Sequence, residues 1–338
     1  MKVLIAGGAG YIGSTIASIC LDNGITPIVL DNLSTGRADF VRDRIFYSGD
    51  INDDGLVRRI FDDHPGITVT VHCAAVLAAP DSVQHPLRYY RENVAKSLAF
   101  VEALVHAGCR RLIFSSSAAV YQPARDFGVD ELSPIGPSTP YGWSKAMLER
   151  ILHDCCRSRL LRGVSLRYQN VVGADPHLRT GPPPAGSARV LDCLLDAAVA
   201  GLPFTITGTD WPTRDGTALR DYVHVWDLAR AHLLTLQKFD TLTSAPTADG
   251  YLPLDLGTGT GTTVAELIRV IEAVLGRPVA VTAGPRRPGD IAGCFTRSHL
   301  ARQQLGWRPQ LTLDAAVRDL LRWRAPAGDH GRVGDFAY

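Results

Sequence analysis

Tyr141 and Lys145 stand four residues apart in the stretch Tyr141-Gly142-Trp143-Ser144-Lys145, which has a helical pattern. An alcohol oxidised by hydride transfer must lose its hydroxyl proton as the hydride leaves the same carbon, so the reaction needs a base with a pKa brought toward neutrality. An ammonium group about 5 Å from a phenol favours the phenolate by about 3 kcal/mol at an effective dielectric constant of about 20. We therefore expect Tyr141 to be the base and Lys145 to lower its pKa.

Ser117 is the third candidate catalytic residue. It ends the run Ser115-Ser116-Ser117, which follows a strand-like apolar stretch at 110–115. Doubly wound sheets bind ligands at the carboxyl ends of their strands. We expect Ser117 to bridge the phenol of Tyr141 and the hydroxyl of a substrate.

A glycine fingerprint near the N-terminus predicts a dinucleotide site. Gly7, Gly10 and Gly13 lie between a strand-like run at 2–6 and a helical pattern at 11–22. In that place, backbone amides and a helix N-terminus can hold a pyrophosphate.

Asp31 follows the second apolar run, at 26–30. A carboxylate there can accept hydrogen bonds from both hydroxyls of an adenosine ribose, and it repels a 2′-phosphate. Together with the fingerprint, Asp31 predicts a nicotinamide dinucleotide, and NAD rather than NADP.

The remaining apolar runs continue an alternation of strands and helices. Strand-like runs lie at 2–6, 26–30, 44–48, 68–73, 110–115 and 163–168, and the helical stretches include 86–107 and 139–160. This alternation is typical of a doubly wound parallel sheet, the Rossmann type of α/β fold.

The alternation ends near Asn170. A proline-rich loop follows at 181–184, the later segments are shorter and more mixed, and the chain is longer than a single core of about 250–300 residues. We therefore expect an NAD-binding Rossmann domain over 1–170 and a smaller C-terminal α/β substrate lobe over 171–325, with some segments returning to the first domain. A flexible tail is expected over 326–338.

The composition argues for a small-molecule enzyme. The 338 residues carry a formal net charge of +1 and no block of Lys or Arg, which argues against nucleic acid or an anionic membrane as the main partner. No apolar run approaches the roughly 18 residues of a membrane span, and the N-terminus has the pattern of a strand rather than of a signal peptide. The seven cysteines include no Cys-x-x-Cys pair, so we expect reduced thiols, no structural disulfide and no metal site. A cytoplasmic protein is expected.

These motifs, in this order, resemble the extended short-chain dehydrogenase/reductase family, and within it the UDP-glucose 4-epimerases. The resemblance runs from Met1 to about Arg322. Besides the residues above, it rests on Asp31-Asn32-Leu33-Ser34, Gly49-Asp50-Ile51, His72-Cys73-Ala74-Ala75, Pro86 to Val94, Pro140-Tyr141, Leu166-Arg167-Tyr168, Pro212 to Thr217, Arg220 to Val225 and Arg287-Pro288-Gly289-Asp290.

The resemblance implies two sets of binding residues. The cofactor NAD would be held by Gly7, Gly10, Tyr11, Ile12, Gly13, Asp31, Asn32, Ser34, Thr35, Gly36, Asp50, Ile51, Ala74, Ala75, Asn93, Ser115, Tyr141, Lys145 and Tyr168. The UDP-sugar would be held by Ser117, Tyr141, Gln169, Asn170, Arg189, Arg220, Arg287, Asp290 and Cys294. Arginines are natural partners of a buried diphosphate, and an acid can accept from ribose hydroxyls.

The same resemblance implies the reaction and the assembly. Tyr141 would take the proton of the sugar's 4-hydroxyl while NAD accepts the hydride, and the 4-ketose would then turn and accept hydride on its other face. UDP-glucose and UDP-galactose are the expected sugars. A homodimer would form through the helical stretches 86–107 and 139–160.

Several positions depart from the commonest pattern of the family and leave alternatives for the sugar. We expect Leu77, Gln169 and Val171 to crowd the sugar pocket, and Arg189 stands in a segment, 185–191, that commonly carries paired asparagines near the uracil in the family.

Two of these alternatives follow from single residues. Cys294 falls where the family places a residue that gates the pocket, and a small residue there admits N-acetylated sugars, so UDP-N-acetylglucosamine is one alternative. A cation at Arg189 would suit UDP-glucuronate, whose carboxylate is costly to bury unpaired.

Two other functions fit the residues less well. A nucleotide-sugar 4,6-dehydratase needs an Asp-Glu pair after the central hydroxyl residue, where Ala118-Ala119 stand. A non-catalytic dinucleotide-binding sensor typically lacks the tyrosine or the lysine, and this chain has both.

Overall fold

A computed structural model of the chain describes residues 1–77, 79–183, 189–244, 249–287 and 290–325. The predicted tail at 326–338 lies outside the described residues, as do positions 185–188 of the segment expected near the uracil and the pair Pro288-Gly289.

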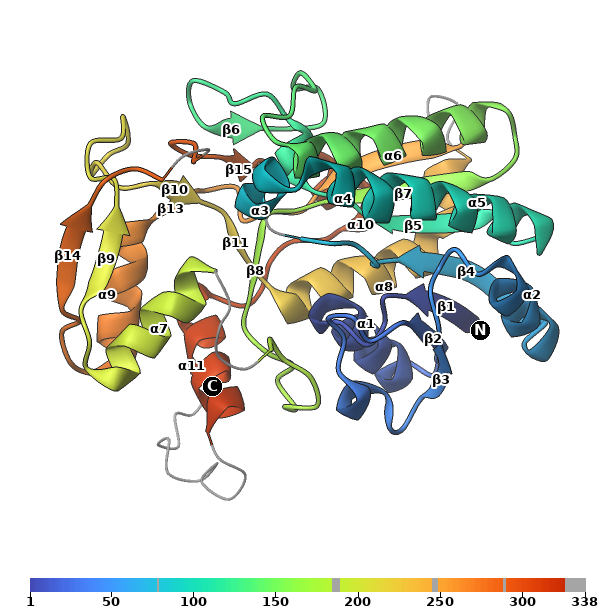
Figure 1. Cartoon of the computed structure of the whole chain (residues 1–338), viewed down its shortest axis with the longest axis horizontal. Helices are drawn as coiled ribbons and strands as arrows, with labels where there is room; N and C mark the ends of the chain where they lie inside the picture. Colours follow the sequence, from blue (N-terminus) through green and yellow to red (C-terminus); the bar gives the residue numbers. More distant parts are fainter. Residues whose placement is uncertain (78, 184–188, 245–248, 288–289, 326–338) are drawn as a thin grey trace.

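A seven-stranded sheet forms the scaffold (Figure 1). The strand order is β12-β7-β5-β4-β1-β2-β3, and every pair in it is parallel. The strands are β1 (Lys2–Ala6), β2 (Thr26–Asp31), β3 (Ile45–Ser48), β4 (Ile67–His72), β5 (Arg111–Ser115), β7 (Arg162–Arg167) and β12 (Tyr251–Asp255). The doubly wound α/β class expected from the sequence is confirmed.

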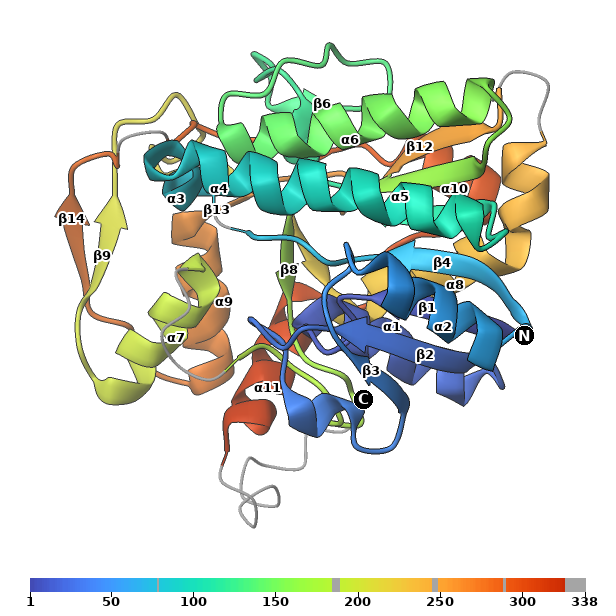
Figure 2. The ribbon, with the colours of Figure 1, turned by 45° about the vertical axis from the view of Figure 1, so that its right-hand side comes forward.

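Helices cover both faces of this sheet (Figure 2). They are α1 (Tyr11–Asp22), α2 (Asp54–Asp63), α5 (Lys96–His106), α6 (Pro140–Arg157) and α8 (Val225–Thr243). On one face, Val3 and Ile5 of β1 pack in a core with α1 and α8. On the other face, Leu4 and Ala6 pack with α2, α5 and α6. Strands buried on both faces form nearly continuous apolar runs, which is why the sequence displays them clearly.

The strand β12 and the helix α8 come from the stretch after residue 170. β12 pairs with β7 from Tyr251 opposite Gly163 to Asp255 opposite Arg167. The chain thus crosses between the two parts of the molecule, and residues beyond 170 complete the sheet on which the candidate site is built.

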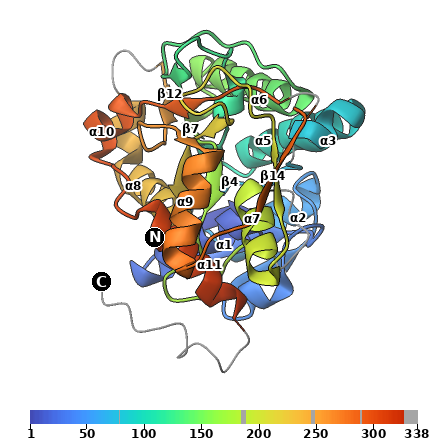
Figure 3. The ribbon, with the colours of Figure 1, turned by 90° about the vertical axis from the view of Figure 1, so that its left-hand side faces the viewer.

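A smaller lobe packs beside the sheet (Figure 3). Its elements are β8 (Asn170–Val172), α7 (Val190–Ala200), β9 (Phe204–Thr207), β10 (Leu219–Arg220), β11 (Tyr222–His224), β13 (Thr262–Thr263), α9 (Val264–Leu275), β14 (Val281–Gly284) and α11 (Leu313–Arg324). The strands form three pairs, β8 with β11, β9 with β14 and β10 with β13. Fully buried Leu194, Ile271 and Val317 bring α7, α9 and α11 into one core.

Shorter elements complete the described chain. They are η1 (Ala38–Val41), α3 (Ala79–Gln84), α4 (Pro86–Tyr90), the π-helical turn η2 (Arg91–Ala95), η3 (Ala118–Val120), β6 (Gly128–Val129), β15 (Phe295–Thr296) and α10 (His299–Leu305).

All seven cysteines are free thiols. Across the described ranges, no helix is both long and apolar enough to cross a membrane. The same residues contain no cluster of three His, Cys, Asp or Glu side chains able to hold a metal ion.

Candidate active site

The glycine fingerprint lies where the strand order reverses, between β1 and β4. Gly7 has φ of +78°, and a Cβ there would lie 2.5 Å from the backbone nitrogen of Ala74, in the loop after β4. A Cβ on Gly13 would lie 2.3 Å from the carbonyl oxygen of Gly7. Gly10 begins α1 without a side-chain cap, so the amides of the first turn face the loop. This cradle fits a pyrophosphate, as the sequence predicts.

Asp31 lies at the end of β2 beside this cradle. Its Oδ2 accepts from the backbone nitrogen of Ala9 at 3.0 Å, and its Oδ1 accepts from that of Leu33 at 2.8 Å. Burial raises the pKa of Asp31, while these backbone donors lower it. A Cβ on Gly36 would come 2.8 Å from Oδ1, so the chain also passes close on that side. The carboxylate is therefore held at a fixed position beside the cradle.

Asp50, one of the residues expected to hold NAD, has a charged partner that was not expected from the sequence. Lys96 Nζ donates to Oδ2 of Asp50 at 2.7 Å, and Asn32 Nδ2 donates to the same oxygen at 3.0 Å. Burial raises the pKa of Asp50, but these two donors bring it below the usual value. The chain has only four lysines, and Lys96 stands four residues after Glu92, with which it also pairs. Because lysines are so few in this chain, the position of Lys96 after Glu92 was the sequence feature that could have pointed to a charged partner for Asp50.

Asn93 lies in the π-helical turn that interrupts the predicted helix 86–107. Its Oδ1 accepts from the backbone nitrogen of Val76 at 2.8 Å, and its Nδ2 donates to the Val76 carbonyl at 3.0 Å. The Nδ2 also donates to Ser144 Oγ at 3.1 Å. Wide helical turns of this kind often occur at functional sites. Asn93 thereby ties the loop after β4 to helix α6.

Helix α6 carries the candidate base. Thr139 caps it by accepting from the nitrogen of Gly142 at 3.2 Å, and Pro140 occupies the first turn. Lys145, one turn after Tyr141, is 3% exposed and donates to the carbonyl oxygen of Ser115 at 2.9 Å.

The pKa of Tyr141 differs from the expectation. Burial raises it above the usual tyrosine value, and the neighbouring Ser117 side chain acts in the opposite direction. Burial also lowers the pKa of Lys145 to about 8. The predicted lowering by Lys145 is not seen in this structure, because both groups are desolvated and the ammonium is directed at the carbonyl of Ser115.

Ser117 caps the short turn η3, and its Oγ accepts from the nitrogen of Ala119 at 3.1 Å. The hydroxyl of Ser115 points elsewhere, toward Cys73 Sγ at 3.1 Å and His232 Nε2 at 3.2 Å. His232 comes from α8 and is fully buried, and no local motif revealed it. Its Nδ1 lies 2.9 Å from the Leu228 carbonyl and so carries the proton, which leaves Nε2 to accept from Ser115.

Other predicted cofactor residues lie around these groups. Tyr168 is 7% exposed, beside Ser115. Tyr11 Oη donates to the carbonyl of Gly173 at 2.5 Å. Ile12, Ile51, Ala74 and Ala75 are buried or partly buried, whereas Ser34 and Thr35 are exposed on the loop after β2.

Of the residues expected at the UDP-sugar, Asn170 begins β8, which pairs with β11, and Arg220 ends β10. Asn170 pairs with Tyr222, and Asn170 Nδ2 donates to the carbonyl of Asp221 at 3.3 Å. Arg220 Nη1 donates to the carbonyl of Leu219 at 2.7 Å. Tyr222 was not predicted: it is 5% exposed, and its hydroxyl has no hydrogen-bond partner among the described residues. It lies two residues after Arg220, but Arg220 ends β10 and Tyr222 begins β11, so no periodicity within one strand pointed to it.

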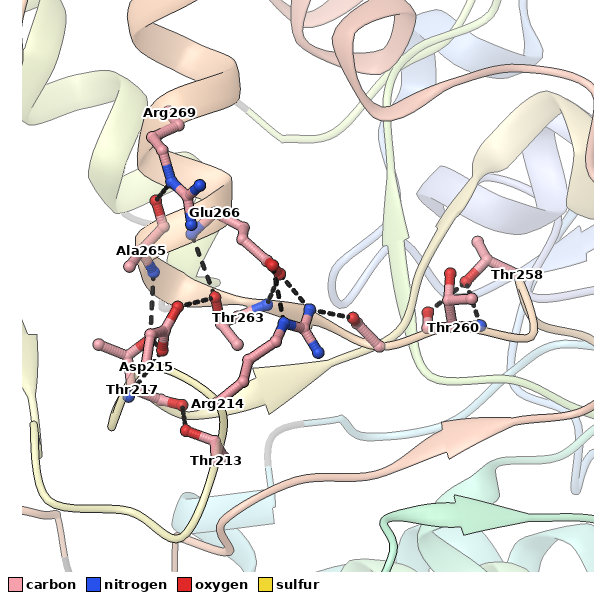
Figure 4. Close-up of polar contacts among 11 residues, drawn as sticks. Thr213, Arg214, Asp215, Thr217, Thr258, Thr260, Thr263, Ala265, Glu266 and Arg269 are labelled. Atoms are coloured by element: carbon pink, nitrogen blue, oxygen red, sulfur yellow. Dashed lines mark hydrogen bonds and ion pairs between the residues drawn. The ribbon is translucent and has the colours of Figure 1, made fainter.

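Residues of the motif Pro212–Thr217 bind the first turn of α9 (Figure 4). Arg214 forms a two-pronged ion pair with Glu266 in the first turn of α9. Asp215 Oδ2 accepts from Thr263 Oγ1 at 2.5 Å, and Thr217 Oγ1 accepts from the nitrogen of Ala265 at 3.1 Å. The motif therefore joins the segment before β10 to β13 and the first turn of α9.

The remaining predicted arginines are paired with acids of the chain. Arg189 Nε lies 2.7 Å from Asp192 Oδ2, and its guanidinium lies 5.1 Å from the ring centre of Tyr11. Arg287 lies 3.1 Å from Asp290 and is more than half exposed.

Gln169 and Cys294, two of the residues expected at the sugar, are neighbours. Cys294 is 8% exposed, and burial raises the pKa of its thiol to about 11, while the Gln169 side chain acts in the opposite direction. The buried Gln169 Nε2 has no hydrogen-bond partner in the described part of the chain.

Residues 3–246 match the NAD dependent epimerase/dehydratase family. The chain belongs to this family. It is 39% identical over 325 residues to a UDP-glucose 4-epimerase of Azospirillum brasilense, which covers 95% of this chain and 91% of the relative. It is 38% identical over 336 residues to a UDP-glucose 4-epimerase of Bacillus subtilis (strain 168), covering 96% and 97%.

A solved member of the family has the same architecture. The UDP-glucose-4-epimerase of Stenotrophomonas maltophila, crystallised with bound NAD and formylated UDP-arabinopyranose, aligns with a TM-score of 0.90 and 34% identity, over 96% of this chain and 98% of that one. The resemblance inferred from the sequence is confirmed.

Proposed function

We propose that this protein is an NAD-dependent 4-epimerase that interconverts UDP-glucose and UDP-galactose. The observation that carries the proposal is the meeting of α6 with the end of β5, where Tyr141 lies beside Ser117 and Lys145 binds the carbonyl of Ser115. This pair lies on the same sheet edge as the glycine cradle.

The cradle at Gly7 and Gly13, with Asp31 and Asp50, has the form needed to hold the dinucleotide. Bound NAD supplies the acceptor and donor of the hydride. Tyr141 takes the proton from the sugar's 4-hydroxyl and later returns it to the same oxygen, so the phenol is restored in each cycle. Ser117 orients the hydroxyl toward the phenol.

Asn170, Arg220, Tyr222, Arg287 and Asp290 are proposed to hold the uridine diphosphate. The unpartnered hydroxyl of Tyr222 and the exposed guanidinium of Arg287 can both donate to phosphate oxygens. Firm binding of the diphosphate lets the 4-ketose turn about its bond to the phosphate without leaving.

A direct assay tests the proposal. The purified protein should convert UDP-galactose to UDP-glucose without an added reductant, and denaturation should release NAD. Failure to convert any UDP-hexose, or release of NADP in place of NAD, would overturn it.

The pairing of Arg189 with Asp192 favours a neutral hexose over a uronate. Arg324 binds Asp192 at 2.7 Å and Asp196 at 2.8 Å, so two carboxylates of the chain balance the two guanidinium groups, including the cation that a glucuronate would need. The small Cys294 keeps UDP-N-acetylglucosamine as a second candidate.

The sugar is tested by comparing kcat/KM for UDP-galactose, UDP-N-acetylgalactosamine and UDP-glucuronate. We expect the neutral sugars to lead and Arg189→Ala to affect all three alike. A lead of about tenfold for UDP-glucuronate that Arg189→Ala erases would reverse the assignment.

We further propose a homodimer through α4, α5 and α6. Leu87, Leu98, Trp143 and Met147 on these helices are 41–75% exposed, which leaves apolar surface for a partner helix pair. A monomer in light scattering at micromolar concentration would contradict it.

The free thiols are in keeping with a reducing cytoplasm as the place of action.

A further inference from the structure

Helix α6 meets the serine stretch after β5 at three successive turns. The first two turns carry Tyr141 and Lys145. At the third turn, the hydroxyl of Ser116 donates to Oε1 of Glu149 at 2.5 Å. Both side chains are more than nine-tenths buried, and Glu149 follows Lys145 at the same four-residue spacing that separates Lys145 from Tyr141. The predicted base and this carboxylate therefore lie on one face of the helix.

Glu149 is paired with Arg167, the last residue of β7. Arg167 Nε donates to the two carboxylate oxygens at 2.9 and 3.1 Å, and its Nη2 also contacts Oε2. Its Nη1 donates to Tyr121 Oη at 2.7 Å, and Tyr121 donates to Asp255 at the end of β12. The network joins the ends of β5, β7 and β12 to α6. No side chain in it is more than 7% exposed, so its polar groups are shielded from water.

We propose that Glu149 and Arg167 form a positioning pair for the epimerase reaction, holding the catalytic helix and the serine stretch in register without touching substrate or cofactor. The inference rests on the proposed function. The geometry supports it because Ser116 lies between the two serines whose atoms meet Lys145 and Tyr141. A shift of α6 along β5 would separate both contacts at once.

Glu149 also acts on the charge of Lys145. Burial lowers the pKa of Lys145 to about 8, while Cys73 and Glu149 act to raise it. His72, also near Lys145, has its pKa lowered by burial to about 3 and is neutral, as is the Tyr141 phenol with its raised pKa. Removing the Glu149 charge should therefore let Lys145 lose its proton at a lower pH.

The test uses Glu149→Gln in the holoenzyme, with kcat and KM for UDP-galactose measured across the alkaline range. We expect kcat to fall by about 10- to 100-fold with KM changed by less than about threefold, because orientation rather than binding is lost. The alkaline limb of the kcat profile should move to lower pH. A wild-type enzyme that converts no UDP-hexose would refute the proposed function, whereas an active wild type and an equally active variant would refute this inference.

Asp227→Asn is the matched control. Asp227 is a fully buried carboxylate in α8, paired with Arg230 at 2.9 Å, and it accepts from the backbone nitrogens of Gln310 and Leu311 rather than from residues of the candidate site. We expect this variant to lower Tm and leave the alkaline limb in place. An equal shift of the limb in both variants would mean that Glu149 acts only through general stability.

A double variant decides the case if Glu149→Gln does not fold. Glu149→Leu with Arg167→Met removes both charges at once, and such replacements often preserve stability. We expect Tm near that of the wild type with kcat still lowered by about tenfold or more. Recovery of both Tm and kcat would show a purely structural pair and overturn the inference.

Discussion

The dinucleotide side of the molecule and the proposed diphosphate side hold their polar groups in different ways. Asp31 is held by two backbone donors, and Lys145 is 3% exposed and bound to a carbonyl. Arg287, in contrast, is more than half exposed and paired with an acid three residues away. A surface pair of this kind contributes little to stability, so it can be exchanged for a phosphate at low cost. The difference suits an enzyme that keeps its cofactor and releases its nucleotide sugar.

The largest expected effect comes from Tyr141→Phe, on the cofactor side. Removing the hydroxyl removes the proposed base, so kcat should fall by about 10³-fold or more. Bound NAD and Tm should stay close to wild type, because the ring remains in place. Activity within about tenfold of wild type would mean that another group is the base.

Loss of cofactor is expected from Gly7→Ala. The added Cβ would lie 2.5 Å from the nitrogen of Ala74, and φ is +78°, so the cradle must shift. The variant should purify with little NAD, measured after denaturation.

The control for that variant is Gly24→Ala. Gly24 has φ of +68° but open space where the Cβ would go, so it shares the backbone strain without the close contact. It should lose some stability and keep its NAD. Equal loss of cofactor in both variants would show that strain, not the shape of the cradle, is responsible.

A smaller, binding-specific effect is expected from Arg287→Ala on the diphosphate side. Loss of a charge-assisted hydrogen bond of about 1.5–3 kcal/mol should raise KM for UDP-galactose about 10- to 100-fold and leave kcat nearly unchanged. Arg286→Ala is the control, since that neighbour is similarly exposed but pairs with Asp210 and stacks on Trp211. If the two variants behave alike, Arg287 does not bind the diphosphate, and the contrast between the two sides loses its basis.

The central strands, the glycine turn and helix α6 could be predicted because their signals are local. A buried parallel strand shows as an apolar run, and a helix of the length of α6 shows its period within a few turns. The expected helix 86–107 contains a π-helical turn. No residue type in that stretch predicts such a turn. The lowered pKa expected for Tyr141 was not found, because spacing along a helix does not show what the ammonium of Lys145 faces.

The sequence by itself determined the fold class, the cradle and the candidate base, because the glycine turn, the apolar strand runs and the helical period can each be recognised within about ten residues of chain. Only the tertiary structure decided which charges meet. Lys96 reaches Asp50 across 46 positions, and His232 reaches Ser115 across 117. Such partners come together because parallel strands end at one edge of the sheet, whatever their order in the chain, and the free energy of desolvating each charge then selects its neighbour.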